Sequence, residues 1–181
     1  SLRVALCPPA VAGAVFLLAG LVQQTSATIH TLVRATDDAH AGRRVRDALE
    51  ASGLWSPGMA KSFETRVRAW RADIELPSLG LAAHRYRMLA QCVTAVVHNA
   101  ACVNYVQTYE AMRAANVEGT RSLLDFALDG HPKAFHLIST TFIFGWTRKG
   151  VLAESDRNDE MEELDFGYAQ SKWVAERLAF S

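Results

Sequence analysis

The 181-residue sequence has few cysteines, no excess charge of either sign and no hydrophobic run of membrane-spanning length. Its cysteines, Cys7, Cys92 and Cys102, are far apart and form no CxxC pair, which argues against a disulfide framework or a zinc site. We therefore expect a reducing, cytoplasmic location. The 19 Lys and Arg residues balance 19 Asp and Glu residues, so no net field favours nucleic acid or an anionic membrane as a partner.

The most apolar stretch, 10–22, is too short to cross a bilayer. A secretory signal is an alternative, because Arg3 precedes the run and small residues follow it near Ser26. Pro8 and Pro9 interrupt its start, however. We expect a buried first element.

Short apolar, β-branched segments alternate with longer segments of helical spacing, and half of the residues are hydrophobic. This alternation predicts an α/β fold with a doubly wound, Rossmann-like parallel sheet. We expect one domain over 1–181, with 1–13 an irregular lead-in. The expected strands are 14–18, 28–33, 66–72, 94–97 and 134–138. The expected helices are 38–53, 82–91, 109–128 and 168–179.

Polar side chains follow four of these strands directly. They are Arg34, Asp73, Asn99 and Thr140. In parallel sheets, ligands bind beyond the carboxyl ends of the strands. The shared placement predicts a binding site at that edge.

Tyr168 and Lys172 are four residues apart, on one face of the last expected helix. A nearby ammonium favours the phenolate, so we expect a lowered Tyr168 pKa and a phenol that can serve as a proton donor. The Thr140 hydroxyl could hold the same carbonyl oxygen. This is the chemistry of hydride addition to a carbonyl from a nicotinamide. Taken alone, a Tyr and a Lys at this spacing are more often ordinary surface residues.

Several motifs occur together, and in their order and spacing they resemble the extended short-chain dehydrogenase/reductases. Within that family they resemble the thioester reductase and fatty acyl reductase branch, the male-sterility type. The segments are Thr-Leu-Val-Arg-Ala (31–35), Val-Val-His-Asn-Ala-Ala-Cys-Val-Asn-Tyr (96–105), Ala-Asn-Val-Glu-Gly-Thr (115–120), His-Leu-Ile-Ser-Thr-Thr-Phe-Ile-Phe-Gly (136–145) and Gly-Tyr-Ala-Gln-Ser-Lys-Trp-Val-Ala-Glu (167–176).

The resemblance implies catalytic roles for Thr140, Tyr168 and Lys172. It implies NADPH as cofactor, because Arg34 matches the arginine that pairs with the adenosine 2′-phosphate. Arg44 could join Arg34 or belong to a solvated helix face with Arg43 and Arg46. The other cofactor-site positions implied by the resemblance are Asp73 and Ile74 beside the adenine, Asn99, Ala100 and Ala101 after the fourth strand, and Asn116, which helps to hold the architecture.

No metal site is expected. His98 has no second ligand at suitable spacing, which favours a structural role. The acidic segment 154–165 lacks the spaced oxygen ligands and glycine of a calcium loop, so we expect a solvated loop.

The family begins with a strand that runs into a Thr-Gly-x-x-Gly-x-x-Gly loop, whose glycines allow close contact with the pyrophosphate. With the first strand placed at 14–18, only Gly13 and Gly20 remain, and the crossover to 28 is too short. We therefore expect a sheet of order 3-2-1-4-5 whose first strand is distorted, shortened or replaced by a helix over 11–24. The family's C-terminal substrate subdomain is also expected to be absent.

The resemblance implies an NADPH-dependent reductase module that releases a carrier-bound or CoA-bound acyl or peptidyl chain as an aldehyde or alcohol. Such a module can belong to a larger nonribosomal peptide or polyketide synthetase. The alternative is a non-catalytic remnant or interaction domain of the same fold. Without the glycine loop, we expect the chain to bind NADPH weakly or not at all.

Overall fold

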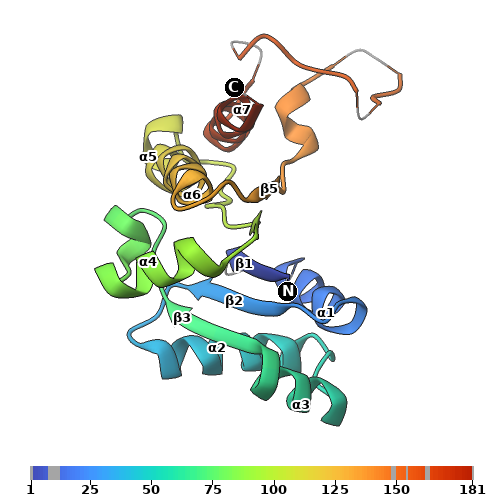
Figure 1. Cartoon of the computed structure of the whole chain (residues 1–181). Helices are drawn as coiled ribbons and strands as arrows, with labels where there is room; N and C mark the ends of the chain where they lie inside the picture. The colour runs from blue at the N-terminus through green and yellow to red at the C-terminus, as the bar shows by residue number, and fades with distance from the viewer. Residues whose placement is uncertain (1, 8–12, 148–149, 154, 162–163, 181) are drawn as a thin grey trace.

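The computed structural model describes residues 2–7, 13–147, 150–153, 155–161 and 164–180. Its strands form a five-stranded parallel sheet of order β3-β2-β1-β4-β5 (Figure 1), which confirms the predicted fold class and strand order. The strands are β1 (Arg3–Cys7), β2 (Thr28–Val33), β3 (Val67–Arg71), β4 (Ala95–His98) and β5 (Ala134–Leu137).

Helices connect these strands. They are α1 (Gly13–Gln24), α2 (Asp38–Ala51), α3 (Pro57–Arg66), α4 (Ala83–Cys92), α5 (Tyr109–Arg113), α6 (Gly119–Leu128) and α7 (Gly167–Phe180). Short helical turns lie at η1 (Pro77–Gly80), η2 (Ala114–Glu118) and η3 (Thr141–Phe144). The single helix expected over 109–128 is interrupted by η2, a π-helical turn between α5 and α6.

The first strand is where the sequence prediction is wrong. β1 is a regular central strand at Arg3–Cys7, paired with both β2 and β4. The expected lead-in therefore contains a strand, and the expected strand at 14–18 lies in α1, whose buried residues recur at helical spacing. The residues from 8 to 27 leave ample length for a crossover that contains α1. Both β1 and α1 are thus regular elements. The connection 8–12 lies outside the described residues.

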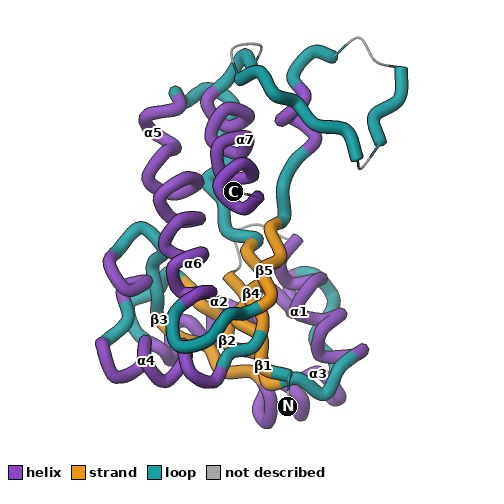
Figure 2. Tube along the Cα trace, turned by 45° about the horizontal axis from the view of Figure 1, so that its top comes forward, coloured by secondary structure: helices purple, strands orange, loops and turns teal. Residues whose placement is uncertain are grey.

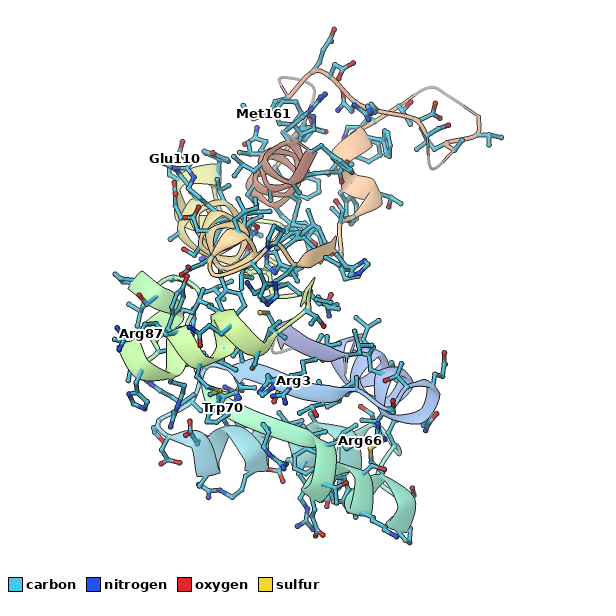
Figure 3. The ribbon with its side chains drawn as sticks, viewed as in Figure 1. Arg3, Arg66, Trp70, Arg87, Glu110 and Met161 are labelled. Atoms are coloured by element: carbon cyan, nitrogen blue, oxygen red, sulfur yellow. The ribbon has the colours of Figure 1, made fainter. Side chains whose placement is uncertain are left out.

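Helix α3 was not predicted from the sequence. The Ser56 hydroxyl accepts a hydrogen bond from Met59 N at 3.2 Å, and Pro57 stands in the first turn. Both are standard signals of a helix start. At the other end, Arg66 donates to Thr25 O at 2.7 Å and to Val22 O at 2.5 Å, which ties α3 to the end of α1 (Figure 3).

Successive residues of the central strand point to opposite faces of the sheet. Val4 and Leu6 belong to a core that α1, α2 and α3 cover. Ala5 and Cys7 belong to a second core that α4 and α6 cover. Figure 2 shows the strands between these two sets of helices, the doubly wound arrangement that the sequence predicts. Because β1 is buried on both faces, its residues are continuously apolar after Arg3.

Candidate active site

A cavity of about 340 Å³ lies at the carboxyl edge of the sheet, beyond β2, β3 and β4. Its volume is in the range of small-molecule sites. It collects six predicted cofactor residues that are distant in the sequence: Arg34, Arg44, Asp73, Ile74, Ala100 and Ala101. Residues of α1 and α2 form an apolar wall of the same cavity, which includes Val15, Leu18, Val45 and Ala48.

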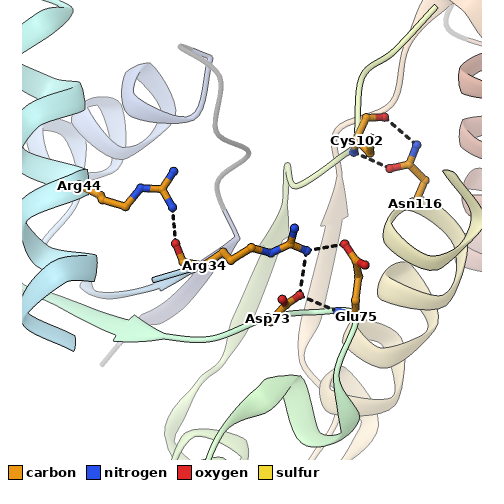
Figure 4. Close-up of polar contacts among 6 residues, drawn as sticks. All are labelled: Arg34, Arg44, Asp73, Glu75, Cys102 and Asn116. Carbon is orange, nitrogen blue, oxygen red and sulfur yellow. Dashed lines mark hydrogen bonds and ion pairs between the residues drawn. The ribbon is translucent and has the colours of Figure 1, made fainter. Parts of the chain in front are cut away.

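Arg34 follows β2, and its guanidinium is held by two acidic side chains (Figure 4). Its Nη2 lies 2.9 Å from Asp73 Oδ1 and also donates to Glu75 Oε1. These hydrogen bonds raise the pKa of Arg34, first through Glu75 and then through Asp73. The side chain is 63% exposed, so the arginine remains accessible from solvent. Glu75 is a cavity residue that was not predicted from the sequence.

Arg44 lines the same cavity and donates from Nη1 to Arg34 O. Arg46, by contrast, pairs with Glu50 on the exposed side of α2, with Nε 2.7 Å from Oε1. The structure therefore places Arg44, which is exposed like Arg46, in the cavity lining and Arg46 outside it.

The loop that carries Asp73 and Glu75 is fixed by several contacts. Asp73 N donates to Leu79 O at 2.9 Å, and Arg71 Nη1 donates to Gly80 O at 3.0 Å. Ser78 and Leu79 have positive φ angles of 52° and 59°, a conformation that costs energy for residues with a side chain. Leu79 is fully buried, and this burial holds the loop in place.

Ile74 packs against α6 at Gly119. A Cβ added to Gly119 would lie 2.7 Å from Ile74 Cδ1, so the helix approaches this closely only because residue 119 is glycine. The Gly119 of the Ala-Asn-Val-Glu-Gly-Thr segment thus positions the cavity wall.

Asn116 is buried in η2 and does not line the cavity. Its Oδ1 accepts from Cys102 N at 2.7 Å, and its Nδ2 donates to Cys102 O and to Ser171 Oγ, both at 2.9 Å. Figure 4 shows the two hydrogen bonds between Asn116 and Cys102. The amide thus ties the segment after β4 to α7, which matches an architectural role. Asn99 also lies outside the cavity lining, and its N–H donates to Cys7 O at 3.2 Å.

Thr140, Tyr168 and Lys172 come together where β5 ends. Tyr168 and Lys172 are buried on α7, and the Thr140 side chain lies close enough to the phenol to lower its pKa. Lys172 Nζ donates to Ile138 O at 2.8 Å, directly after β5. None of the three lines the 340 Å³ cavity.

The pKa of Tyr168 moves opposite to the sequence expectation. Burial raises it, the hydrogen bond from Thr140 lowers it, and Tyr105 raises it further, with a net upward shift. Burial also lowers the pKa of Lys172 to about 8, against the influence of Glu176. The phenol therefore holds its proton at neutral pH. Lys172 is not among the causes of the shift, and the loss of contact with water dominates the pKa of Tyr168.

An aromatic cluster surrounds the Tyr168 ring. Tyr105 and Phe142 stack edge-on to it at centroid distances of 5.8 and 6.4 Å, and Phe166 contacts both of them. Tyr105 is 57% exposed and Phe142 44% exposed. This cluster was not predicted from the sequence, although Tyr105 and Phe142 lie inside the motifs that carry the family resemblance.

His98 is buried at the end of β4, with Nε2 2.9 Å from Thr120 Oγ1. Burial, and to a lesser extent Lys172, lower its pKa to about 3. A neutral histidine that bonds across to α6 agrees with the structural role expected. Among the residues that the structure describes, no group of three or more His, Cys, Asp or Glu side chains could hold a metal. No helix in the described ranges is long and apolar enough to span a membrane.

The cavity fits the adenosine half of a nicotinamide dinucleotide. Apolar walls suit a base, and guanidinium groups suit phosphate. The buried Thr31 hydroxyl, also in the lining, has no hydrogen-bond partner within the described part of the chain. The segment that would meet the pyrophosphate, 8–12, lies outside the described residues, and its sequence contains no glycine.

Comparison with known proteins agrees with this geometry. The chain is 38% identical, with a TM-score of 0.90, to the crystal structure of the terminal R domain from the myxalamid PKS-NRPS biosynthetic pathway, and the match covers 99% of this chain and 45% of that one. A reductase (R) domain of a nonribosomal peptide synthetase from Mycobacterium tuberculosis is 25% identical, with a TM-score of 0.80, over 98% of this chain and 43% of that one.

Curated relatives give the same picture. The non-canonical nonribosomal peptide synthetase FrzA from a Cladobotryum species is 39% identical over 90% of this chain, which is 16% of that protein. Glycine betaine reductase ATRR from Emericella nidulans is 38% identical over 90% of this chain and 13% of that protein. The chain thus spans less than half the length of each protein named here. The NAD-binding family model described as Male sterility protein matches residues 13–181, and the chain belongs to this family, whose cofactor is a nicotinamide dinucleotide.

Proposed function

We propose that the chain is the nucleotide-binding part of an NADPH-dependent reductase that acts on a carrier-bound or CoA-bound thioester and yields an aldehyde or alcohol. The observation that carries the proposal is the meeting of Thr140, Tyr168 and Lys172 at the same sheet edge as an arginine-lined cavity. The likeness to reductase domains supports it.

The roles follow from the contacts. The nicotinamide cofactor would supply a hydride to the thioester carbonyl carbon, and the C–S bond would then break, so that the carrier or CoA leaves as a thiol with the proton of the carbonyl-derived oxygen as the aldehyde forms. Tyr168, protonated at neutral pH, donates a proton to the carbonyl oxygen, and the Thr140 hydroxyl holds that oxygen in place. Lys172 lies one turn after Tyr168 on α7, and with its Nζ anchored on Ile138 O it would place a positive charge near the phenol as the phenol loses its proton.

The choice of NADPH rests on two cations. The Arg34 guanidinium can donate to a phosphate, and Arg44 lies in the same lining. In this proposal Asp73 and Ile74 lie beside the adenine. The backbone of Asn99, Ala100 and Ala101 approaches the cofactor. Asn116 supports the site through Cys102 and Ser171.

The substrate side is apolar. Tyr105 and Phe142 are exposed next to Tyr168, as suits an acyl group attached to a carrier or to CoA. A carrier-bound substrate implies that the chain works within a larger multidomain synthetase in the cytoplasm. The balanced charge gives no reason to invoke nucleic acid or membrane.

One observation favours the alternative, a non-catalytic domain of the same fold. Between Cys7 and Gly13 the sequence has no glycine, and it has Pro8 and Pro9, which lack the N–H groups that a pyrophosphate needs. Losing two hydrogen bonds to a charged group weakens binding by about two to four decades. We therefore expect measurable but weak NADPH binding, carried by the adenosine end.

Calorimetric titration with NADPH separates the two functions. Binding that falls at least about tenfold in Arg34→Leu but not in Arg43→Leu, an exposed arginine of α2 outside the cavity, supports the reductase assignment. Tyr168→Phe should keep NADPH binding and lose thioester reduction, followed as NADPH oxidation with an acyl-CoA. A chain that binds no NADPH at millimolar concentration is the non-catalytic domain.

A further inference from the structure

We propose that Glu75 sets the coenzyme preference of this cavity: it occupies the edge of the Arg34 guanidinium that a 2′-phosphate requires, and so weakens NADPH relative to NADH. This inference rests on the proposed binding of a nicotinamide dinucleotide. It adds Glu75 as a residue that determines coenzyme specificity by disfavouring the 2′-phosphate of NADPH.

The first step is the geometry of the guanidinium. Both carboxylates contact one nitrogen, Arg34 Nη2, with Asp73 Oδ1 at 2.9 Å and Glu75 Oε1 also accepting from it. A guanidinium has two edges that present a pair of parallel N–H donors, Nε with Nη2 and Nη1 with Nη2. Both edges include Nη2. A phosphate can therefore bind Arg34 through two donors only if an acidic side chain moves away.

The second step is that Glu75 is held where it competes. Its own N–H donates to Asp73 Oδ1 at 3.1 Å, and Leu76 N donates to Asp73 O at 3.1 Å, so the backbone turns tightly around Asp73 (Figure 4). The buried Leu79 anchors the same loop. Glu75 is thus presented by a fixed turn, and its side chain is 32% exposed.

The third step is charge. A 2′-phosphate carries a charge close to −2 at neutral pH, and Glu75 lines the cavity in which it would lie. The carboxylate therefore opposes the phosphate twice, by occupying the donor and by like-charge repulsion. NADH has a 2′-hydroxyl at this position, which feels no such repulsion and can donate to a carboxylate. The residue thus shifts the balance toward NADH without excluding either coenzyme.

The expected size is moderate, because the pair is partly exposed. Exposed ion pairs contribute up to about 1 kcal/mol, which is about fivefold in affinity, and removing the repulsion adds to this. We expect Glu75→Gln and Glu75→Ala to raise the NADPH-to-NADH affinity ratio about three- to tenfold. The matched control is Glu50→Gln, which breaks the Arg46 pair on α2 outside the cavity and should leave the ratio within about twofold.

The test is calorimetric titration of the 181-residue chain and its variants with NADPH and NADH, with melting temperatures to verify folding. A rise in the ratio for both Glu75 variants, smaller in an Arg34→Leu background, supports the proposal. If the parent chain binds NADPH and the ratio stays within twofold in both variants, the role of Glu75 is refuted and the proposed function stands. If neither coenzyme binds the parent chain or its Glu75 variants, both fail together.

Discussion

At the residue scale, Lys172 carries the largest electrostatic cost among the proposed catalytic groups. It is 3% exposed and has a backbone carbonyl, Ile138 O, as its hydrogen-bond partner. Burial lowers its pKa to about 8, from 10.5. The unfolded chain therefore binds this proton more tightly than the folded chain does. The cost is fully present below pH 8 and disappears as the pH rises to about 10.5.

Removing this charge should stabilise the fold and abolish reduction. At pH 7 we expect Lys172→Met to raise the free energy of unfolding by roughly 1–3 kcal/mol. Each unit of pKa shift corresponds to about 1.4 kcal/mol of cost that the substitution removes, and the loss of the hydrogen bond to Ile138 O offsets part of this gain. Urea denaturation at pH 7 measures this gain. Lys61→Met, at an exposed position of α3, should change stability little. A Lys172→Met variant less stable than the parent would contradict the assignment of a costly buried charge.

At the element scale, a glycine seats α7, the helix that carries Tyr168 and Lys172. A Cβ added to Gly167 would lie 2.3 Å from Thr108 C and 2.4 Å from Tyr109 N. The start of α7 therefore rests directly on the backbone at the start of α5. This contact places Tyr168 one residue later, beside Tyr105.

We expect Gly167→Ala to lower the free energy of unfolding by about 2–4 kcal/mol, because neither backbone can move aside without breaking its helix start. Gly42→Ala is the matched control: Gly42 is inside α2 with nothing within 4 Å of the added Cβ, so alanine there should stabilise by about 0.5–1 kcal/mol. Chemical denaturation of both variants provides the comparison. Equal effects at the two glycines would show that α5 and α7 are not in this close contact.

At the scale of the whole molecule, two buried histidines link stability to pH. Burial lowers the pKa of His98 to about 3 and that of His30 to about 4, from 6.5. His30 Nδ1 lies 3.0 Å from Trp70 Nε1, and His98 bonds to Thr120. Each histidine is neutral in the folded chain, while the unfolded chain takes up protons below about pH 6.5. Their contribution to stability is therefore complete above pH 6.5 and declines as the pH falls.

Between pH 7 and pH 5 we expect the free energy of unfolding to fall by roughly 2–4 kcal/mol from this pair, at about 1.4 kcal/mol per unit and histidine. Urea titrations at several pH values give the slope. His98→Gln should make the slope shallower whatever its effect on stability at pH 7. His84→Gln, at an exposed position of α4, should retain the parent slope. Identical slopes in all three proteins would mean that His98 takes up its proton without unfolding.

The sequence by itself determined the order of most elements and the edge of the sheet where the site lies. The β-branched run at β2 matches its predicted bounds, and the Asp37 cap of α2 accepts from His40 N at 2.7 Å. These signals are local, since a cap or a strand end depends on neighbouring residues. The carboxyl ends of parallel strands share one edge, so Arg34, Asp73 and Thr140 could be placed at that edge from their positions in the sequence.

Only the tertiary structure decided where the central strand lies and what surrounds the functional groups. Arg3–Cys7 is a strand because it pairs with β2 and β4 and is buried on both faces, whereas the more apolar residues from Gly13 onward form helix α1. Arg34 meets Asp73 and Glu75 across 39 and 41 residues, and Tyr168 meets Tyr105. Burial of Tyr168 then reversed the expected direction of its pKa shift. Non-local pairing and loss of solvent have no signature in short-range spacing, because both depend on residues that the chain brings together only when it folds.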